Sequence, residues 1–217
     1  MNYEIIGSSS KGNCIIVEDI LMLDCGVTYK KIKPFLKNIK LIFISHCHKD
    51  HLNPITIKQI AYNYPTIKFI TGSKYVIQNL VLFGVNQKNI FPLKCHKKYD
   101  LGLLKVKLEQ LYHDTPNYAL KWELNGKKGI YAVDTERIDH IVAEDYDLYL
   151  IESNYNEELL KEHINNCEDT NMLYYLDRVS KTHLSDTQCN DFLIQNMGEN
   201  SVYEKIHKSS YNYKEVD

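Results

Sequence analysis

The stretch that decides the fold is Leu41-Ile42-Phe43-Ile44-Ser45-His46-Cys47-His48-Lys49-Asp50-His51. Its short apolar start predicts a buried β-strand, and the polar residues follow at the carboxyl end of that strand. Three imidazoles and one carboxylate within six residues suit the ligation of transition metals. Alternation along an extended backbone puts His46 and His48 on one side, and Asp50 and His51 come from the turn beyond. Four ligands here, with further candidates elsewhere, predict two metal ions.

The same arrangement, an apolar strand followed by polar residues, recurs along the chain. Further strands of this kind are predicted at 105–111, 128–133, 148–151 and 202–206. The candidate ligands beyond these strands, or near a predicted helix end, are His113, Asp134, His183 and His207. Because a rigid sheet holds the loops at its strand ends, these side chains are expected to meet and to complete a two-metal site.

Strands interspersed with helices predict a layered α/β protein. Turn signals at Glu18-Asp19 and Asn125-Gly126 predict two hairpins. Helices are predicted at 27–36, 54–62, 73–82, 157–165 and 186–195. No linker or internal repeat interrupts the pattern, so residues 1–217 are expected to form a single domain.

Composition excludes several classes of protein. The 217 residues are 44% hydrophobic and 25% charged, which excludes a disordered chain, and no apolar run is long enough to span a membrane. Met1–Ser10 lacks a basic region followed by an apolar stretch, so a cytoplasmic protein with reduced thiols is expected. Residues 1–133 carry 19 Lys and Arg against 9 Asp and Glu, whereas residues 134–217 carry 7 against 19. The basic half could attract an anionic substrate, or its charges could simply solvate the surface.

The HxHxDH segment, His46 to His51, resembles the hallmark of the metallo-β-lactamase-fold hydrolases. This resemblance covers essentially the whole chain and implies an αββα four-layer sandwich of two packed mixed sheets with outer helices. Asp24 resembles the aspartate of the first motif of that family and His113 the histidine of the third. Asp134 resembles the metal-bridging aspartate, and His207 the final histidine.

Three further segments resemble the YycJ/WalJ-type branch of the family: Gly7–Asn13, Leu23–Gly26 and Glu152–Asn154. That branch is associated with exonuclease activity on single-stranded DNA. The resemblance implies two divalent ions, Zn or Mn. The implied ligands are His46, His48 and His113 for one ion, Asp50, His51 and His207 for the other, and Asp134 as the bridge.

The last two histidines are both candidates for the final metal ligand. The order of segments is similar to that of tRNase Z-like relatives and implies that His207 binds metal while His183, paired with Glu152, donates a proton. Asp50 could orient the attacking hydroxide. Asp24 would hold the ligand loop without touching metal, or would be an ordinary turn residue. The candidates for substrate contact, all equally plausible as structural or surface residues, are Ser8, Ser9, Asn154 and Asn212.

The number of residues between the candidate ligands excludes some classes of nuclease. The 20 residues between His113 and Asp134 leave no room for the tRNA-binding arm of tRNase Z-like enzymes. The 72 residues between Asp134 and His207 are too few for the inserted domain of the β-CASP nucleases. The first hypothesis is a binuclear phosphodiesterase or exonuclease acting on single-stranded DNA. The second is hydrolysis of a small or cyclic nucleotide, because no substrate-gripping addition is evident. The third is a catalytically silent binding module. Oligomeric state is left open.

Overall fold

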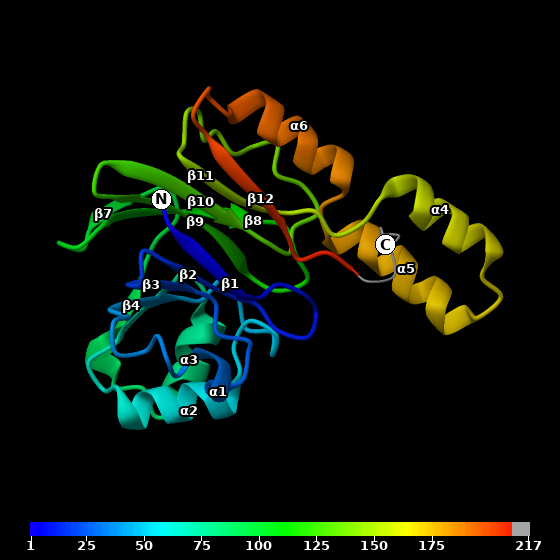
Figure 1. Ribbon diagram of the computed structural model, residues 1–217. Helices are drawn as coiled ribbons and strands as arrows, with labels where there is room; N and C mark the ends of the chain where they lie inside the picture. Colours follow the sequence, from blue (N-terminus) through cyan, green and yellow to red (C-terminus); the bar gives the residue numbers. More distant parts are fainter. Residues whose placement is uncertain (210–217) are drawn as a thin grey trace.

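Two mixed β-sheets packed face to face form the centre of the computed structural model, which describes residues 1–209 (Figure 1). The first sheet has six strands in chain order: β1 (Tyr3–Gly7), β2 (Cys14–Val17), β3 (Leu21–Leu23), β4 (Leu41–Phe43), β5 (Lys68–Thr71) and β6 (Ile90–Pro92). The pairs β1–β2 and β2–β3 are antiparallel, and the remaining pairs are parallel.

The second sheet has its six strands in reverse order across the sheet: β12 (Val202–Ile206), β11 (Leu148–Glu152), β10 (Lys127–Ala132), β9 (Asn117–Leu124), β8 (Lys105–Leu111) and β7 (Lys98–Asp100). The pairs β12–β11 and β11–β10 are parallel, and the others are antiparallel. Because two antiparallel steps separate β8 from β10, the strands β8, β10, β11 and β12 all run in the same direction. Their carboxyl ends therefore lie at one edge of the sheet.

Helices cover the outer faces of both sheets. Three lie below the first sheet in Figure 1: α1 (Tyr29–Ile32), α2 (Pro54–Asn63) and α3 (Lys74–Leu82). The helix α6 (Asp186–Asn196) packs against the second sheet, and a short 3-10 turn, η1, spans Gln87–Asn89. Two more helices, α4 (Glu157–Asn166) and α5 (Thr170–Thr182), form an antiparallel pair that projects from the body. No helix in residues 1–209 is long and apolar enough to cross a membrane.

Alternating burial explains the layers. In β4, Leu41 and Phe43 pack between the two sheets, while Ile42 packs against the helices below. The same division holds in β3, where Met22 faces the helices and its neighbours face the other sheet. A strand buried on both faces reads as a continuous apolar run, which is the pattern seen in the sequence. The predicted α/β sandwich of two packed mixed sheets with outer helices is confirmed.

The hairpins predicted from the sequence are present, but the predicted helices agree only in part with the structure. Both predicted hairpins form, and Glu18, Asp19, Asn125 and Gly126 all adopt the positive φ that tight hairpin turns require. The helix expected over 27–36 was too long, because only Tyr29–Ile32 is α-helical and short turns follow it. The helix α5 was not predicted at all, although Asp169 caps its first turn.

Candidate metal centre

The candidate ligands come from both sheets. The loop 45–51 follows β4 of the first sheet, and three other candidate ligands follow strands of the second sheet. Those three are His113 after β8, Asp134 after β10 and His207 after β12, while Glu152, the expected partner of His183, ends β11. The centre therefore lies where one edge of each sheet meets the other.

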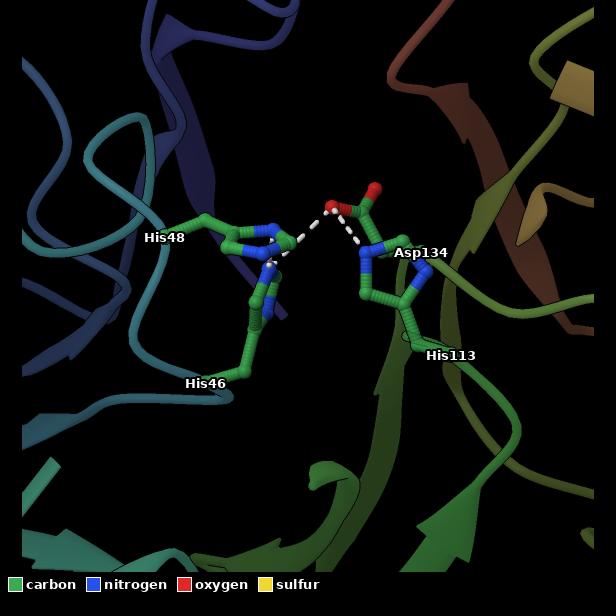
Figure 2. A group of neighbouring side chains, drawn as sticks. All are labelled: His46, His48, His113 and Asp134. Carbon is green, nitrogen blue, oxygen red and sulfur yellow. Dashed lines mark hydrogen bonds and ion pairs between the residues drawn. The ribbon is translucent and has the colours of Figure 1, made fainter. Parts of the chain in front are cut away.

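The first group of ligands comprises His46, His48, His113 and Asp134, which point toward a common centre in Figure 2. Nε2 of His46 lies 3.1 Å from Nδ1 of His48 and 3.3 Å from Oδ2 of Asp134. Nε2 of His113 lies 3.8 Å from the same oxygen. Ligand atoms arranged tetrahedrally at Zn–N distances are about 3.4 Å apart, so this spacing fits one ion.

The second group comprises Asp50, His51, Asp134 and His207. Nε2 of His51 lies 3.3 Å from Oδ2 of Asp50 and 3.1 Å from Oδ2 of Asp134. Nε2 of His207 lies 3.8 Å from Oδ2 of Asp50. Oδ2 of Asp134 thus borders both groups, which is the position that a bridging ligand would occupy.

The histidines of both groups use their second nitrogen for other contacts, as metal-bound histidines do. His46 Nδ1 lies 3.0 Å from Ser45 Oγ, and His113 Nδ1 lies 2.9 Å from the carbonyl oxygen of Thr182. His48 Nε2 lies 3.3 Å from Oδ1 of Asp114. These contacts fix each ring so that the opposite nitrogen faces the centre.

The Asp24 carboxylate organises the metal loop from behind. It is fully buried and accepts hydrogen bonds from the backbone N–H and the hydroxyl of Ser45, both at 2.8 Å, and from the Tyr131 hydroxyl at 2.7 Å. His51 Nδ1 lies 2.6 Å from the same carboxylate. Asp24 lies behind the His51 ring and outside both ligand groups, as expected of a residue that orients a ligand.

Unsatisfied polar atoms provide an independent test of whether these residues fit a metal. Among residues 1–209, the buried side-chain atoms without a hydrogen-bond partner are His207 Nε2 and Asp134 Oδ1. Oδ1 lies 2.8 Å from His207 Nδ1 in an ion-pair contact. Buried polar atoms are almost always partnered, so two exceptions in one imidazole–carboxylate cluster fit the binding of cations.

His183 and Glu152 form a pair beside the second group. His183 Nδ1 lies 2.6 Å from Oε1 of Glu152, which is fully buried. The same oxygen lies 3.1 Å from His207 Nδ1. Atoms of His183, Glu152, His207 and Asp134 could themselves surround an ion. His207 nevertheless directs Nε2 toward Asp50, which favours it over His183 as the final ligand.

The charges of the ligands act strongly on one another. Burial lowers the pKa of His46 to about 4, and the nearby His51 adds to this effect. Burial alone would lower the pKa of His51, but Asp134 and Asp24 raise it well above its ordinary value. Burial likewise opposes ionisation of Asp134, yet His207 and His51 hold its pKa well below the usual range. Asp134 is therefore a buried carboxylate that is stabilised by its surroundings as an anion.

A cavity of about 250 Å³ opens onto the centre. Its lining includes Asn154, whose amide donates to the carbonyl oxygen of His207 at 2.9 Å. Of the serines expected to touch substrate, Ser8 accepts a hydrogen bond from the His207 backbone N–H at 2.7 Å, and Ser9 accepts one from Lys11. The neighbouring Ser10 lines the cavity instead. Asn212 lies outside the described residues.

Several residues at the centre were missed by the sequence analysis. Asn13 donates to the Asp50 carbonyl oxygen from its backbone N–H at 2.7 Å, and Asp114 touches His48 and His113. The sequence contained a signal for both residues: Asn13 ends the Gly7–Asn13 segment, and Asp114 is next to the predicted ligand His113. Tyr175 and Arg178 also line the cavity, but they come from the unpredicted helix α5.

The fold and this site together define a metallo-β-lactamase-fold protein, and comparisons with known structures agree. The human tRNase Z, short form, has a TM-score of 0.67 at 15% identity and covers 97% of this chain and 93% of its own. The Zn²⁺-bound PqqB from Methylobacterium extorquens has a TM-score of 0.65 at 12% identity and covers 98% and 90%. At such identities the likeness shows the fold alone. No protein-family model matches the chain.

Within this fold, the sequence resembles exodeoxyribonuclease WalJ of Streptococcus pneumoniae, as the Gly7–Asn13, Leu23–Gly26 and Glu152–Asn154 segments predicted. The two are 28% identical over 180 residues, which is 73% of this chain. The match spans 64% of the WalJ chain. The chain is also similar, over a shorter stretch, to the cytidine monophosphate-N-acetylneuraminic acid hydroxylase of Sus scrofa. The two are 31% identical over 106 residues, which is 47% of this chain and 24% of the hydroxylase.

Proposed function

We propose that this chain is a binuclear metal-dependent phosphodiesterase that acts as an exonuclease on single-stranded DNA. The observation that carries the proposal is the pair of ligand groups that share Oδ2 of Asp134. Two-metal sites of this kind are typical of phosphatases and nucleases, because two ions stabilise both the attacking and the leaving oxygen of a phosphoryl group. The likeness to an exodeoxyribonuclease favours DNA as the polymer.

The protein's own residues would divide the work. His46, His48 and His113 would hold one divalent ion, Asp50, His51 and His207 the other, and Asp134 would join them. The ions, Zn or Mn, would supply the charge that activates water and neutralises the phosphodiester. Asp50, 24% exposed on the cavity side, would accept a hydrogen bond from the attacking water and orient it.

The leaving oxygen needs a proton, and His183 would supply it. Its ring borders the cavity while Nδ1 is held at 2.6 Å by Glu152, so Nε2 is the nitrogen available to substrate. A histidine oriented by a buried carboxylate is a common general acid near neutral pH. Oε2 of Glu152 also accepts a hydrogen bond from the backbone N–H of Leu184 at 3.2 Å, which helps to fix the carboxylate beside the His183 ring.

The test is cleavage of a 5′-labelled single-stranded oligonucleotide beside a panel of cyclic nucleotides, with Mn²⁺, with Zn²⁺ and with chelator. Asp134→Ala should abolish turnover because it removes the ligand common to both groups. Asp139→Ala is the matched control, since Asp139 is an exposed aspartate outside the cavity. We expect metal-dependent shortening of the oligonucleotide by the wild type and by Asp139→Ala only.

The other hypotheses correspond to the other outcomes of this experiment. Hydrolysis of cyclic nucleotides without loss of the oligonucleotide would replace the exonuclease with a small-nucleotide phosphodiesterase. Binding of metal and oligonucleotide with no turnover of either substrate would indicate a binding module. Turnover that survives in Asp134→Ala would contradict the two-metal mechanism itself.

A further inference from the structure

The helix α5, which pairs with α4, contributes side chains to the lining of the cavity at the candidate metal centre. The pair projects from the body (Figure 1). The helix α5 nevertheless ends at the centre, because its C-cap is His183. Leu160, Leu176 and Val179 form a small apolar core inside the pair. This core fixes the rotation of α5 about its own axis and so determines which of its residues face the cavity.

The residues that α5 presents to the cavity are Tyr175 and Arg178. They are three positions apart and therefore share one face of the helix. Tyr175 is 39% exposed, and the side chain of Arg178 is 52% exposed. Arg178 Nη1 lies 4.0 Å from Oδ2 of Asp114, which is the outer limit of an ion pair. The guanidinium is thus held near the centre while most of its five N–H donors remain available.

We propose that Tyr175 and Arg178 form a clamp for the nucleotide next to the scissile phosphodiester. Tyr175 stacks on its unpaired base, and Arg178 binds its phosphate. The proposal rests on the proposed function and names the form of nucleic acid that the site accepts. An aromatic ring stacks on a base whose face no neighbouring base covers, and a single strand readily exposes such faces. Arginine suits the phosphate because its planar fork matches two phosphate oxygens at once.

Charge limits this clamp to the part of α5 next to the cavity. The rest of the helix pair and its connecting loop carry mainly acidic residues, which repel a phosphate backbone: Glu157, Glu158, Glu162, Glu168 and Asp169. The basic residues of the pair are Lys161, Arg178 and Lys181. A cavity of about 250 Å³ is below the usual range for drug-sized ligands and suits about one nucleotide. The clamp therefore engages one unpaired nucleotide and does not track a long strand.

The chain offers a matched control for each residue of the clamp. Tyr174 adjoins Tyr175 but is 73% exposed and does not line the cavity. Lys181 carries the same charge as Arg178 on the same helix, but it is paired with Asp177 at 2.8 Å. Tyr174→Ala and Lys181→Ala should therefore behave as wild type, and circular dichroism of all variants would show that α5 remains folded.

The decisive measurements are binding and cleavage of a 5′-labelled single-stranded oligonucleotide. Arg178→Ala should weaken both by about tenfold to a hundredfold, because a charge-assisted hydrogen bond to phosphate is lost. Tyr175→Ala should weaken both by about fivefold to a hundredfold, whereas Tyr175→Phe keeps the ring and should retain most of the affinity. Hydrolysis of bis(p-nitrophenyl) phosphate by Tyr174→Ala and Lys181→Ala should equal that of the wild type, because neither residue lines the cavity.

The binding arm is measured by fluorescence anisotropy with chelator present, so it does not depend on turnover. If the wild type binds the oligonucleotide through Tyr175 and Arg178 but never cleaves it, the clamp stands and the proposed phosphodiesterase falls. If Tyr175→Ala and Arg178→Ala bind and cleave as well as Tyr174→Ala and Lys181→Ala, the clamp is wrong. It is equally wrong if the wild type does not bind the oligonucleotide, or if duplex DNA with paired ends binds as tightly as single-stranded DNA.

Discussion

Three residues of the candidate centre adopt a left-handed backbone conformation: Asp24, Asp134 and His207, with φ of 58°, 54° and 56°. Asp24 and His207 directly follow the strands β3 and β12, and Asp134 lies two residues beyond the end of β10. This conformation is uncommon for residues other than glycine and costs on the order of 1 kcal/mol. It turns the chain sharply, so the side chain leaves the line of the strand and faces the neighbouring loops. The surrounding hydrogen bonds offset the cost.

Asp24 should affect metal binding without touching metal. Asp24→Asn removes the charge beside His51 Nδ1 and should weaken metal affinity by about tenfold to a hundredfold, the usual effect of losing such a partner. Isothermal titration with Zn²⁺ or Mn²⁺ would measure it. Asp19→Asn is the matched control, because Asp19 has the same φ of 58° but lies in an exposed hairpin turn. Equal affinities for the two variants would show that Asp24 is only a turn residue.

Gly26 should be needed because the metal loop passes directly over it. A Cβ added to Gly26 would lie 1.6 Å from the Asp50 carbonyl oxygen, so Gly26→Ala must displace the loop. We expect loss of metal binding and activity. Gly102→Ala is the control: the added Cβ meets open space, and the variant loses about 1–2 kcal/mol of stability from its positive φ. Metal content by atomic absorption would distinguish the two, and full occupancy in Gly26→Ala would contradict the packing argument.

At the scale of elements, β8 and β9 carry a charged cluster on the outer face of the second sheet. Glu109 is 6% exposed, and its carboxylate lies 2.6 Å from Lys107 Nζ, 3.4 Å from Lys121 Nζ and 2.6 Å from His96 Nδ1. Burial alone would raise the pKa of Glu109, but Lys107, Lys121 and His96 bring it below its ordinary value. The folded state therefore favours ionised Glu109.

A depressed pKa in the folded state gives stability that is present above the unfolded pKa and is lost as pH falls through the folded pKa. Glu109→Gln should therefore lower the free energy of unfolding by about 1–3 kcal/mol at pH 7, because the buried Lys121 ammonium loses its carboxylate partner. The difference from wild type should shrink below about pH 4. Urea denaturation with chelator would measure it.

The control for this prediction is Glu123→Gln on the neighbouring strand. Glu123 pairs with Lys105 at 3.1 Å, but both side chains are largely exposed, so the change should be less than about 1 kcal/mol at any pH. A Glu109→Gln penalty that stayed constant from pH 7 to pH 3 would contradict the assignment to ionised Glu109.

At the scale of the whole molecule, the candidate centre joins the two sheets. The loop 45–51 belongs to the first sheet, whereas His113, Asp134 and His207 belong to the second. Ions held by both sets would bind the folded chain and not the unfolded one. At a hundred times its dissociation constant, one such ion adds about 2.7 kcal/mol to the free energy of unfolding.

Metal removal should therefore lower the melting temperature. We expect chelator to reduce the Tm of the wild type by several degrees, and Zn²⁺ or Mn²⁺ to restore it. Asp134→Ala should show no such dependence, because both ligand groups lose a member. Differential scanning calorimetry would measure the effect. A wild-type Tm that did not respond to metal would contradict preferential binding to the folded state.

The sequence by itself determined most of the strands, the two hairpins and the metal loop, but not the short strands β6 and β7. Local geometry suffices there, because residues as close as His46 and His51 have few possible arrangements on a strand end and its turn. The αββα architecture also followed from the resemblance of this loop and its companion motifs to a known family. These conclusions depend on short separations along the chain or on motifs that keep their order.

The tertiary structure decided the geometry with which distant residues meet and which further residues join them. The register of β10, β11 and β12 brings Asp134, Glu152 and His207 together, and the small core of α4–α5 turns Tyr175 and Arg178 toward the cavity. The sequence left His183 and His207 as rival ligands, and the direction of Nε2 of His207 favours one of them. The physical reason is that sheet register and helix rotation result from packing across the whole core. Neither the register nor the rotation can be predicted from the few residues around the side chain that it positions.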